Sequence, residues 1–153
     1  MLLAIDTSTA QVGLALYDGI QVLSEMTWTT RQHHTTELAP ALSGLLARSG
    51  NSMDMVSALG VAIGPGSFTS LRVGLSLVKG IALARRIPVI GIPTLDIIAA
   101  AQPVGKNSSR LVAVVRAGRT RVALGWYKNI KNEWQAEGEI RGATVDELAD
   151  EIE

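Results

Sequence analysis

The order of the predicted secondary structure repeats along the 153-residue chain, and this repeat constrains the fold more than any single motif does. Hydrophobic periodicity predicts three strands followed by a helix near the start, and the same order begins again near Arg110. The predicted elements are 2–5, 11–17, 21–28 and 35–49 in the first set, and 110–115, 120–127, 134–140 and a helix from 144 in the second. Between the two sets we predict a strand at 58–63, a helix at 68–86, a strand at 89–92 and a short helix at 94–101.

A unit of three strands and a helix that occurs twice is typical of the two-lobed ribonuclease-H-like architecture, the actin-like ATPase (ASKHA) superfamily fold of actin, sugar kinases and Hsp70. We therefore predict an α/β protein of this class. The polar segment 102–109, with Pro103 and Gly105, predicts the boundary between an N-terminal lobe at 1–103 and a second lobe at 104–153. Because the chain stops inside a predicted helix, we expect the second lobe to be incomplete.

The composition excludes several classes of function. Hydrophobic residues make up 47% of the chain and charged residues 18%, which is typical of a packed domain. Lys and Arg total 14, as do Asp and Glu, so the overall charge provides no general attraction to nucleic acid. The chain has no cysteine, which excludes disulfides and thiolate metal sites. No basic leader precedes Asp6, and apolar runs stop well short of the ~20 residues that span a bilayer, so we expect a soluble, cytoplasmic protein.

A polar turn, Asp6-Thr7-Ser8-Thr9, follows the first predicted strand at its carboxyl end, where open α/β sheets usually bind ligands. Asp6, Thr7 and Ser8 are therefore candidates for contact with a phosphate group or a nucleotide. The alternative is a turn whose Asp and Ser side chains satisfy their own backbone. The matching turn of the second lobe has Arg116 where an acid would be expected, and an arginine cannot ligate magnesium. This difference argues against ATP chemistry by the chain alone.

The second candidate for phosphate contact is the turn Gly64-Pro65-Gly66-Ser67, which leads into the helix at 68–86. Backbone N–H groups at a helix start can hold a phosphate, so Gly64, Gly66 and Ser67 join the candidates. The glycine spacing matches neither GxGxxG nor GxxxxGK[ST], however, so the local pattern is not that of a nucleotide loop.

The helix at 68–86 has apolar residues on two of its faces. One stripe contains Leu71, Leu75, Val78 and Ala82, and the other contains Val73, Leu77, Ile81 and Ala84. One face can lie on the sheet of the same chain, and the other needs a neighbour. That neighbour is either a partner chain or the helix at 35–49, and small residues such as Gly74 and Gly80 would let another helix approach closely.

No catalytic residue and no metal site is predicted. His33 and His34 are adjacent in sequence, so they do not share a helix face, and the chain has no further histidine to complete a pair. No cysteine nucleophile exists, and the serines form no recognisable triad pattern.

The run GPGSFTSLRVG at 64–74 strongly resembles GPGSFTGLRVG, the hallmark of the bacterial TsaB family, also called YeaZ, of tRNA threonylcarbamoyladenosine biosynthesis. Ile5-Asp6-Thr7-Ser8, His34, Lys79-Gly80 and the segment 91–95 are also similar to that family, and the match covers about the first hundred residues. Ser70 replaces the usual glycine, and Arg116 stands where an Asp-Ala-Arg turn is common.

The resemblance implies a protein without catalysis of its own that pairs with the related catalytic subunit TsaD, in an assembly that also uses the ATPase TsaE. It implies that ATP and a metal belong to those partner subunits, that no cofactor belongs to this chain, and that tRNA is reached indirectly. The family has also been labelled glycoprotease or peptidase M22-like.

We therefore predict a scaffold that docks TsaD through the two long helices, with homodimerisation through the same faces as a substitute. The predicted interface residues are His34, Leu38, Leu42, Leu45, Leu71, Gly74, Leu75, Leu77 and Val78. The alternatives are an ATPase or phosphotransferase that uses Asp6 and the Gly64 turn and, after it, a metallopeptidase. Arg116, Arg119 and Arg121 have two interpretations: they contact tRNA directly, or they form an edge that only solvent covers.

Overall fold

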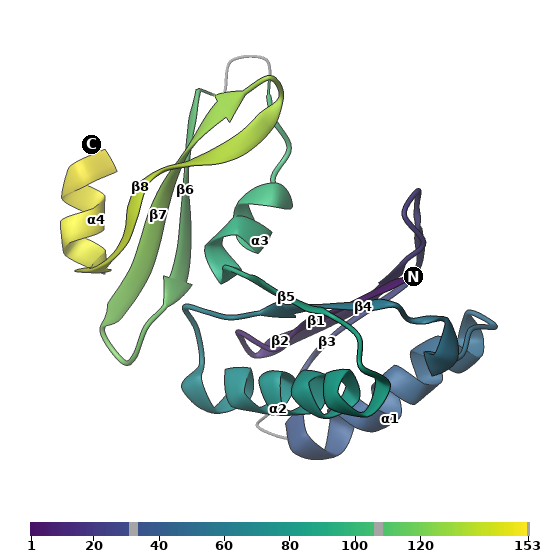
Figure 1. The fold of residues 1–153 in the computed structure, drawn as a ribbon. Helices are drawn as coiled ribbons and strands as arrows, with labels where there is room; N and C mark the ends of the chain where they lie inside the picture. The colour runs from purple at the N-terminus through teal and green to yellow at the C-terminus, as the bar shows by residue number, and fades with distance from the viewer. Residues whose placement is uncertain (31–33, 106–108, 153) are drawn as a thin grey trace. The chain divides into compact units, whose positions relative to one another are not determined.

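The computed structural model describes residues 1–30, 34–105 and 109–152 (Figure 1). The chain forms two compact units. Unit 1 consists of Met1–Ile63 and Ser67–Ile92, and unit 2 consists of Gly64–Gly66 and Pro93–Glu153. His34 belongs to a described helix, whereas its side chain and the whole of His33 lie outside the described residues.

Unit 1 contains a five-stranded sheet with the order β3-β2-β1-β4-β5. Its strands are β1 (Leu2–Asp6), β2 (Gln11–Tyr17), β3 (Val22–Thr29), β4 (Ala58–Ala62) and β5 (Val89–Ile92). Its helices are α1 (His34–Arg48), the short 3-10 helix η1 (Met53–Met55) and α2 (Phe68–Arg85). Strands β1, β2 and β3 pair antiparallel, whereas β4 and β5 run parallel to β1. The antiparallel strands are joined by short turns, and the parallel strands are reached through the helices.

One face of this sheet and the two long helices form the core of unit 1. Because side chains alternate between the faces of a strand, every second residue of β1 and β2 points toward the helices. The buried strand residues are Leu3, Ile5, Val12, Leu14, Leu16, Leu59 and Val61, and the helices add Leu38, Leu42, Leu45, Leu46 and Val78. Helices α1 and α2 lie on the same side of the sheet (Figure 1) and also contact each other.

Helix α2 approaches β1 closely at one point. The hydroxyl of Thr7, the residue after β1, donates a hydrogen bond of 2.8 Å to the Ser70 carbonyl oxygen. One turn further along the helix, Gly74 faces the same threonine, and a Cβ atom added to Gly74 would overlap Thr7 Oγ1. Ser70, Gly74 and Val78 follow one another at helical spacing and are all buried. The small residues of this line therefore allow the helix to pack closely on the sheet of the same chain.

Unit 2 contains an antiparallel sheet with the order β6-β7-β8 and a helix on each of its faces. Its elements are β6 (Arg110–Arg116), β7 (Arg121–Ile130), β8 (Glu133–Thr144), α3 (Thr94–Ala100) and α4 (Val145–Ile152). Leu95 and Ala99 of α3 pack on one face of the sheet, and Leu148 of α4 packs on the other. Each unit thus has three antiparallel strands followed by a helix, and the predicted fold class is confirmed.

The boundary between the units differs from the prediction. The division lies at Pro93 and not after residue 103, because α3 buries its apolar side chains against the β6-β7-β8 sheet. Strand β7 continues through Ile130, and Lys131 and Asn132 make the turn to β8 with positive φ angles of 54° and 66°. Thr144 and Glu147 form a capping box at the start of α4: Thr144 N donates to Glu147 Oε2 at 2.8 Å, and Glu147 N donates to Thr144 Oγ1 at 3.2 Å.

We expect Gly74→Ala to lower the free energy of unfolding by about 1–3 kcal/mol, because the added methyl group displaces Thr7 in a packed contact. Gly80→Ala is the matched control in the same helix, since an added Cβ there meets nothing within 4 Å. This control should raise stability by up to about 1 kcal/mol, because alanine favours a helix more than glycine does. Urea unfolding of both variants measures the difference, and equal effects would contradict the close approach of α2 to β1.

We expect Thr7→Val to cost about 0.5–1.5 kcal/mol of stability, because valine keeps the shape of threonine and removes the donor to Ser70 O. Thr9→Val, in the same turn, removes two exposed hydrogen bonds, one to Gln11 O and one from Gln11 N, and should stay within about 0.5 kcal/mol of the parent. Chemical denaturation of the two valine variants side by side measures the difference. A loss at Thr9 as large as that at Thr7 would be evidence against the anchoring role.

Candidate functional site

The turn after β1 satisfies much of its own backbone. Asp6 Oδ1 accepts a hydrogen bond of 2.8 Å from Ser8 N, and Ser8 O accepts one of 2.7 Å from Ser67 N. Thr7 and Ser8 are each 1% exposed, and Ser8 Oγ is buried without a hydrogen-bond partner in the described part of the chain. The arrangement fits the structural interpretation of this turn, since its side chains hold the chain against the start of α2.

The residues predicted to contact phosphate are divided between the two units. Asp6, Thr7, Ser8 and Ser67 lie together in unit 1, where β1 ends and α2 begins, whereas Gly64 and Gly66 belong to unit 2. Ser67 caps α2: its Oγ accepts from Ser70 N at 3.4 Å and lies 2.8 Å from Ser70 Oγ. A phosphate at this helix start would compete with the Ser67 cap for the Ser70 N–H. Phosphate contact at these residues stays a prediction.

Five of the predicted interface residues are buried in unit 1. Leu38, Leu42, Leu45 and Val78 are at most 5% exposed, and Gly74 is buried against Thr7. Their side of α1 and α2 faces the sheet and the neighbouring helix within unit 1. Contacts within the chain account for the apolar or small character of these five, and their place at an interface stays a prediction. Leu71, Leu75 and Leu77 are partly buried, and the side chain of His34 lies outside the described residues.

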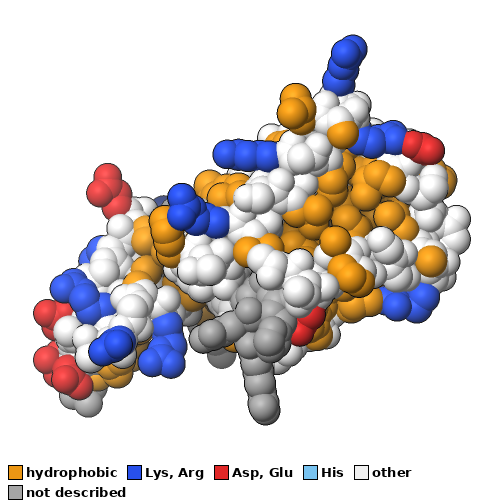
Figure 2. Space-filling view, turned by 90° about the horizontal axis from the view of Figure 1, so that it is seen from below, with side chains coloured by type: hydrophobic (Ala, Val, Ile, Leu, Met, Phe, Trp, Pro, Cys, Tyr) orange, Lys and Arg blue, Asp and Glu red, His pale blue; other side chains and the backbone are white. Residues whose placement is uncertain are grey.

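The exposed line of α2 was not identified from the sequence. Phe68 is 71% exposed and Leu83 is 83% exposed. Leu83 follows Gly74 by two and a half turns of 3.6 residues, so it lies on the opposite side of the helix from the contact with Thr7. Exposed Arg72, Ser76 and Lys79 continue the same outward line, with Gly80 and Ala84 beside it. Figure 2 shows hydrophobic side chains gathered on the helical face of unit 1.

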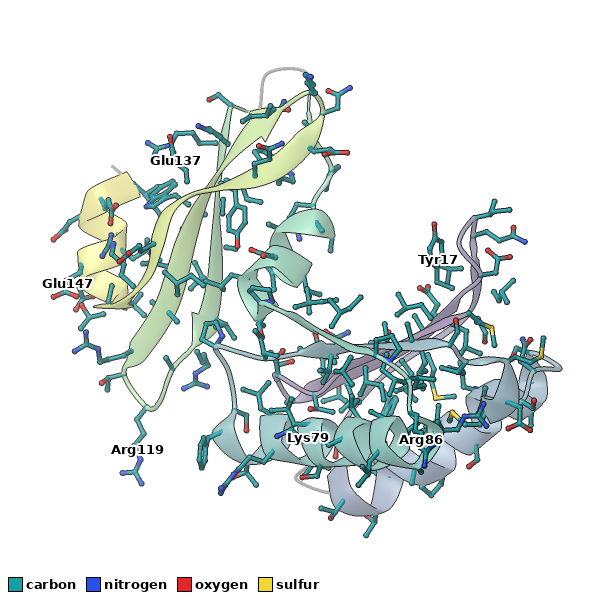
Figure 3. All side chains as sticks on the ribbon, in the orientation of Figure 1. Tyr17, Lys79, Arg86, Arg119, Glu137 and Glu147 are labelled. Carbon is teal, nitrogen blue, oxygen red and sulfur yellow. The ribbon has the colours of Figure 1, made fainter. Side chains whose placement is uncertain are left out.

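This outward line, which we call the α2 surface, consists of Phe68, Arg72, Ser76, Lys79, Gly80, Leu83 and Ala84. The helix contains no acidic residue, and Arg72 lies over the Phe68 ring at 4.7 Å from its centre. Lys79 lies on α2 in the middle of this line (Figure 3). Arg85, in contrast, forms an ion pair with Asp54. The α2 surface is therefore apolar at both ends and positively charged between them.

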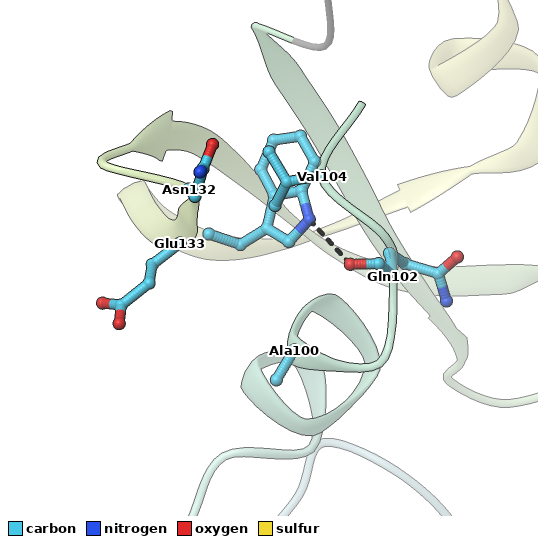
Figure 4. A pocket seen from close by; sticks show the side chains of 6 residues that line it. Ala100, Gln102, Val104, Asn132 and Glu133 are labelled. Atoms are coloured by element: carbon cyan, nitrogen blue, oxygen red, sulfur yellow. Dashed lines mark hydrogen bonds between the residues drawn. The ribbon is translucent and has the colours of Figure 1, made fainter. Parts of the chain in front are cut away.

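Unit 2 has a shallow hollow between α3 and the β7–β8 turn (Figure 4). It has a volume of about 770 Å³ and is lined by Ala100, Gln102, Val104, Asn132, Glu133 and Trp134. Trp134 Nε1 donates a hydrogen bond of 3.1 Å to Gln102 O across this hollow. Glu133 is the single ionisable residue among the described residues of the lining, which therefore provide no acid–base pair.

The described residues show neither a cluster of metal ligands nor a helix that could span a membrane. Over residues 1–30, 34–105 and 109–152, no three His, Cys, Asp or Glu side chains come together in a way that would hold a metal ion. None of the described helices combines the length and the apolar character needed to cross a membrane.

Comparison with known proteins connects this fold to one family. The family model described as TsaD, tRNA N6-adenosine threonylcarbamoyltransferase, matches residues 21–152. The tRNA threonylcarbamoyladenosine biosynthesis protein TsaB of Escherichia coli K12 is 32% identical over 137 residues, which cover 89% of this chain and 59% of that protein. TsaB of Bacillus subtilis 168 is 32% identical over 131 residues, which cover 84% of this chain and 56% of that protein.

The solved structure of YeaZ from Pseudomonas aeruginosa superposes with a TM-score of 0.85 and 29% identity, over 94% of this chain and 67% of that one. The present chain spans less than two thirds of the length of the curated relatives named above. The resemblance predicted from the GPGSFTSLRVG run is confirmed by these matches. The chain belongs to the tRNA N6-adenosine threonylcarbamoyltransferase family, in which it is similar to the TsaB (YeaZ) proteins.

Proposed function

We propose that this chain is a non-catalytic docking subunit for threonylcarbamoyl transfer to the adenosine beside the anticodon of tRNA. In this proposal it binds a TsaD-type catalytic subunit through the α2 surface. The similarity to the TsaB proteins of Escherichia coli and Bacillus subtilis supports the reaction, since these are tRNA threonylcarbamoyladenosine biosynthesis proteins. The observation that carries the docking role is the exposure of Phe68 and Leu83 on a helix whose opposite side is fixed to the sheet.

Large apolar side chains on the α2 surface favour association. Phe68 and Leu83 are 71% and 83% exposed, and full burial of such a side chain contributes about 1.5–3 kcal/mol. Ser76, Gly80 and Ala84 lie between and beside them, and their small size lets a partner helix come close to the backbone. An added Cβ at Gly80 meets nothing within 4 Å, so there is open space on this side of the helix.

The charge of the α2 surface defines the partner further. Arg72 and Lys79 are exposed, and no acidic residue of α2 neutralises them. A complementary partner surface would carry carboxylates opposite these two side chains around an apolar centre. Such complementarity mainly speeds association and sets the orientation of the two chains, while the apolar contacts provide most of the affinity.

The non-catalytic role is supported by the two turns at which the sequence left ATP chemistry open as an alternative. The Asp6 carboxylate accepts from Ser8 N, and Arg116 occupies the end of β6, where an acid was expected. In this proposal ATP and a metal belong to the catalytic subunit and to a TsaE-type ATPase. When the partner is absent, a second copy of this chain would cover the same α2 surface.

We expect Leu83→Glu and Phe68→Glu each to weaken binding of a co-expressed TsaD-type subunit by about 10- to 100-fold, because each change removes about 1.5–3 kcal/mol of apolar burial. Affinity capture followed by titration of the purified subunits measures the effect. Both positions are exposed in the free chain, so the unfolding midpoint should change little.

Ile20→Glu is the matched control, since Ile20 is 90% exposed in unit 1 on the β2–β3 turn and not on α2. This variant should bind the TsaD-type subunit like the parent. Unchanged binding by Leu83→Glu and Phe68→Glu would rule out docking through α2, and an equal loss in Ile20→Glu would show that the effect is not specific to that helix.

A further inference from the structure

The turn between β6 and β7 concentrates positive charge at one end of unit 2. The chain leaves β6 at Arg116, turns through residues 117–120, and enters β7 at Arg121. Ala117 N donates a hydrogen bond of 2.9 Å to Arg121 O, and Gly118 has a φ angle of +100°, which favours glycine. All six residues from 116 to 121 are exposed, three of them are arginines, and none is acidic.

Two of these arginines are not neutralised within the described part of the chain. Arg121 is held by a 3.3 Å hydrogen bond to Gly142 O. The pKa of Glu147 is lowered first by the hydrogen bond from Thr144 N and also by the charges of Arg121 and Arg141, so Arg121 has an acidic neighbour. Arg116 and Arg119 form no ion pair or hydrogen bond with a described residue. Figure 3 shows Arg119 extending outward from the turn.

Arg110 and Arg141, the other two arginines of unit 2, have acidic partners. Arg110 pairs with Glu137 at 2.9 Å and lies over the Trp126 ring, and Arg141 pairs with Glu151. The 116–121 turn is therefore the place in unit 2 where arginine charge is left without a carboxylate. A guanidinium group in this situation presents several N–H donors in a plane that fits two oxygens of a phosphate.

The shape of the turn selects the kind of phosphate ligand. Small ligands are held in concave sites that surround them, whereas this turn is an exposed strand connection and lines no part of the hollow at Trp134. An exposed arginine pair suits an extended backbone that brings successive phosphates past it. We propose that Arg116 and Arg119 contact the phosphate backbone of RNA. This inference rests on the proposed function for its choice of RNA as the polyanion.

Such contacts position an RNA without reading its sequence. The chain has no net charge, so the attraction is local and the affinity of the chain alone is low. Each phosphate contact adds about 0.7–0.9 to the slope of log K against log salt, so two contacts give about 1.4–1.8. Raising the salt concentration from about 50 to about 200 mM should therefore weaken binding about tenfold.

Titration of the ¹⁵N-labelled 153-residue chain with an unmodified anticodon stem–loop RNA tests the proposal by NMR, which detects weak binding residue by residue. We expect the amide signals of Ala117, Gly118 and Thr120 to shift, and the shifts to weaken with salt as calculated. The double variant R116Q/R119Q should lose them and lose the salt dependence. The matched control K128Q/K131Q removes the same charge at the other end of β7 and should keep them.

Three results would overturn the proposal. The first is no shift at these amides with the RNA, and the second is the same shift in R116Q/R119Q. The third is an equal shift with ATP at the same total phosphate concentration, which would assign the arginines to free nucleotides. Capture of the TsaD-type subunit by R116Q/R119Q separates this inference from the proposed function. If R116Q/R119Q loses the RNA shifts but still captures the TsaD-type subunit, both the inference and the proposed function are supported. The same holds if Leu83→Glu keeps the RNA shifts but no longer captures that subunit.

Discussion

The close approach of Gly74 to Thr7 determines which side of α2 faces solvent. Thr7 directly follows β1 and donates to the carbonyl oxygen of Ser70, so the helix is held beside the central strand of its sheet by a hydrogen bond and by direct packing. A helix fixed along Ser70, Gly74 and Val78 has no freedom to rotate about its axis. The residues half a turn away, above all Leu83, then face outward whatever their polarity. The exposed apolar surface is therefore a consequence of how the core is packed.

The two units place different chemistry at the surface. Unit 1 exposes apolar side chains together with Arg72 and Lys79 on α2, whereas the other large apolar side chains of α1 and α2 are buried or partly buried. Unit 2 exposes arginines on a strand connection and neutralises Arg110 and Arg141 with carboxylates. An apolar helix face suits a folded protein partner, and unpaired arginines on a turn suit a polyanion. The two surfaces can therefore be altered independently, since they lie on different units of the chain.

Much of the fold follows from the residues. The alternation of apolar residues in β2, the Gly50 end of α1 and the capping box at Thr144 and Glu147 predict elements close to those observed. The buried side of helix α2 could not be predicted from the sequence, because the helix has apolar or small residues on most of its sides. Its periodicity favoured the stripe of Leu71, Leu75 and Val78, whereas the buried line contains Ser70 and Gly74.

The reason is that Thr7 needs small neighbours, and Thr7 is distant in sequence from α2. The packing of helix α3 could not be predicted for a similar reason: Leu95 and Ala99 identify its apolar face but do not tell which sheet this face covers. The β7–β8 turn uses Lys131 and Asn132 at positive φ without a glycine, so it carried no glycine signal for a tight turn.

Hydrogen–deuterium exchange of this chain, with and without its TsaD-type partner, tests the docking account most directly. The account predicts that the partner slows exchange along Phe68–Arg85, with no change at the β2–β3 turn around Ile20. Protection of the β6-β7-β8 sheet with unchanged exchange in α2 would contradict it.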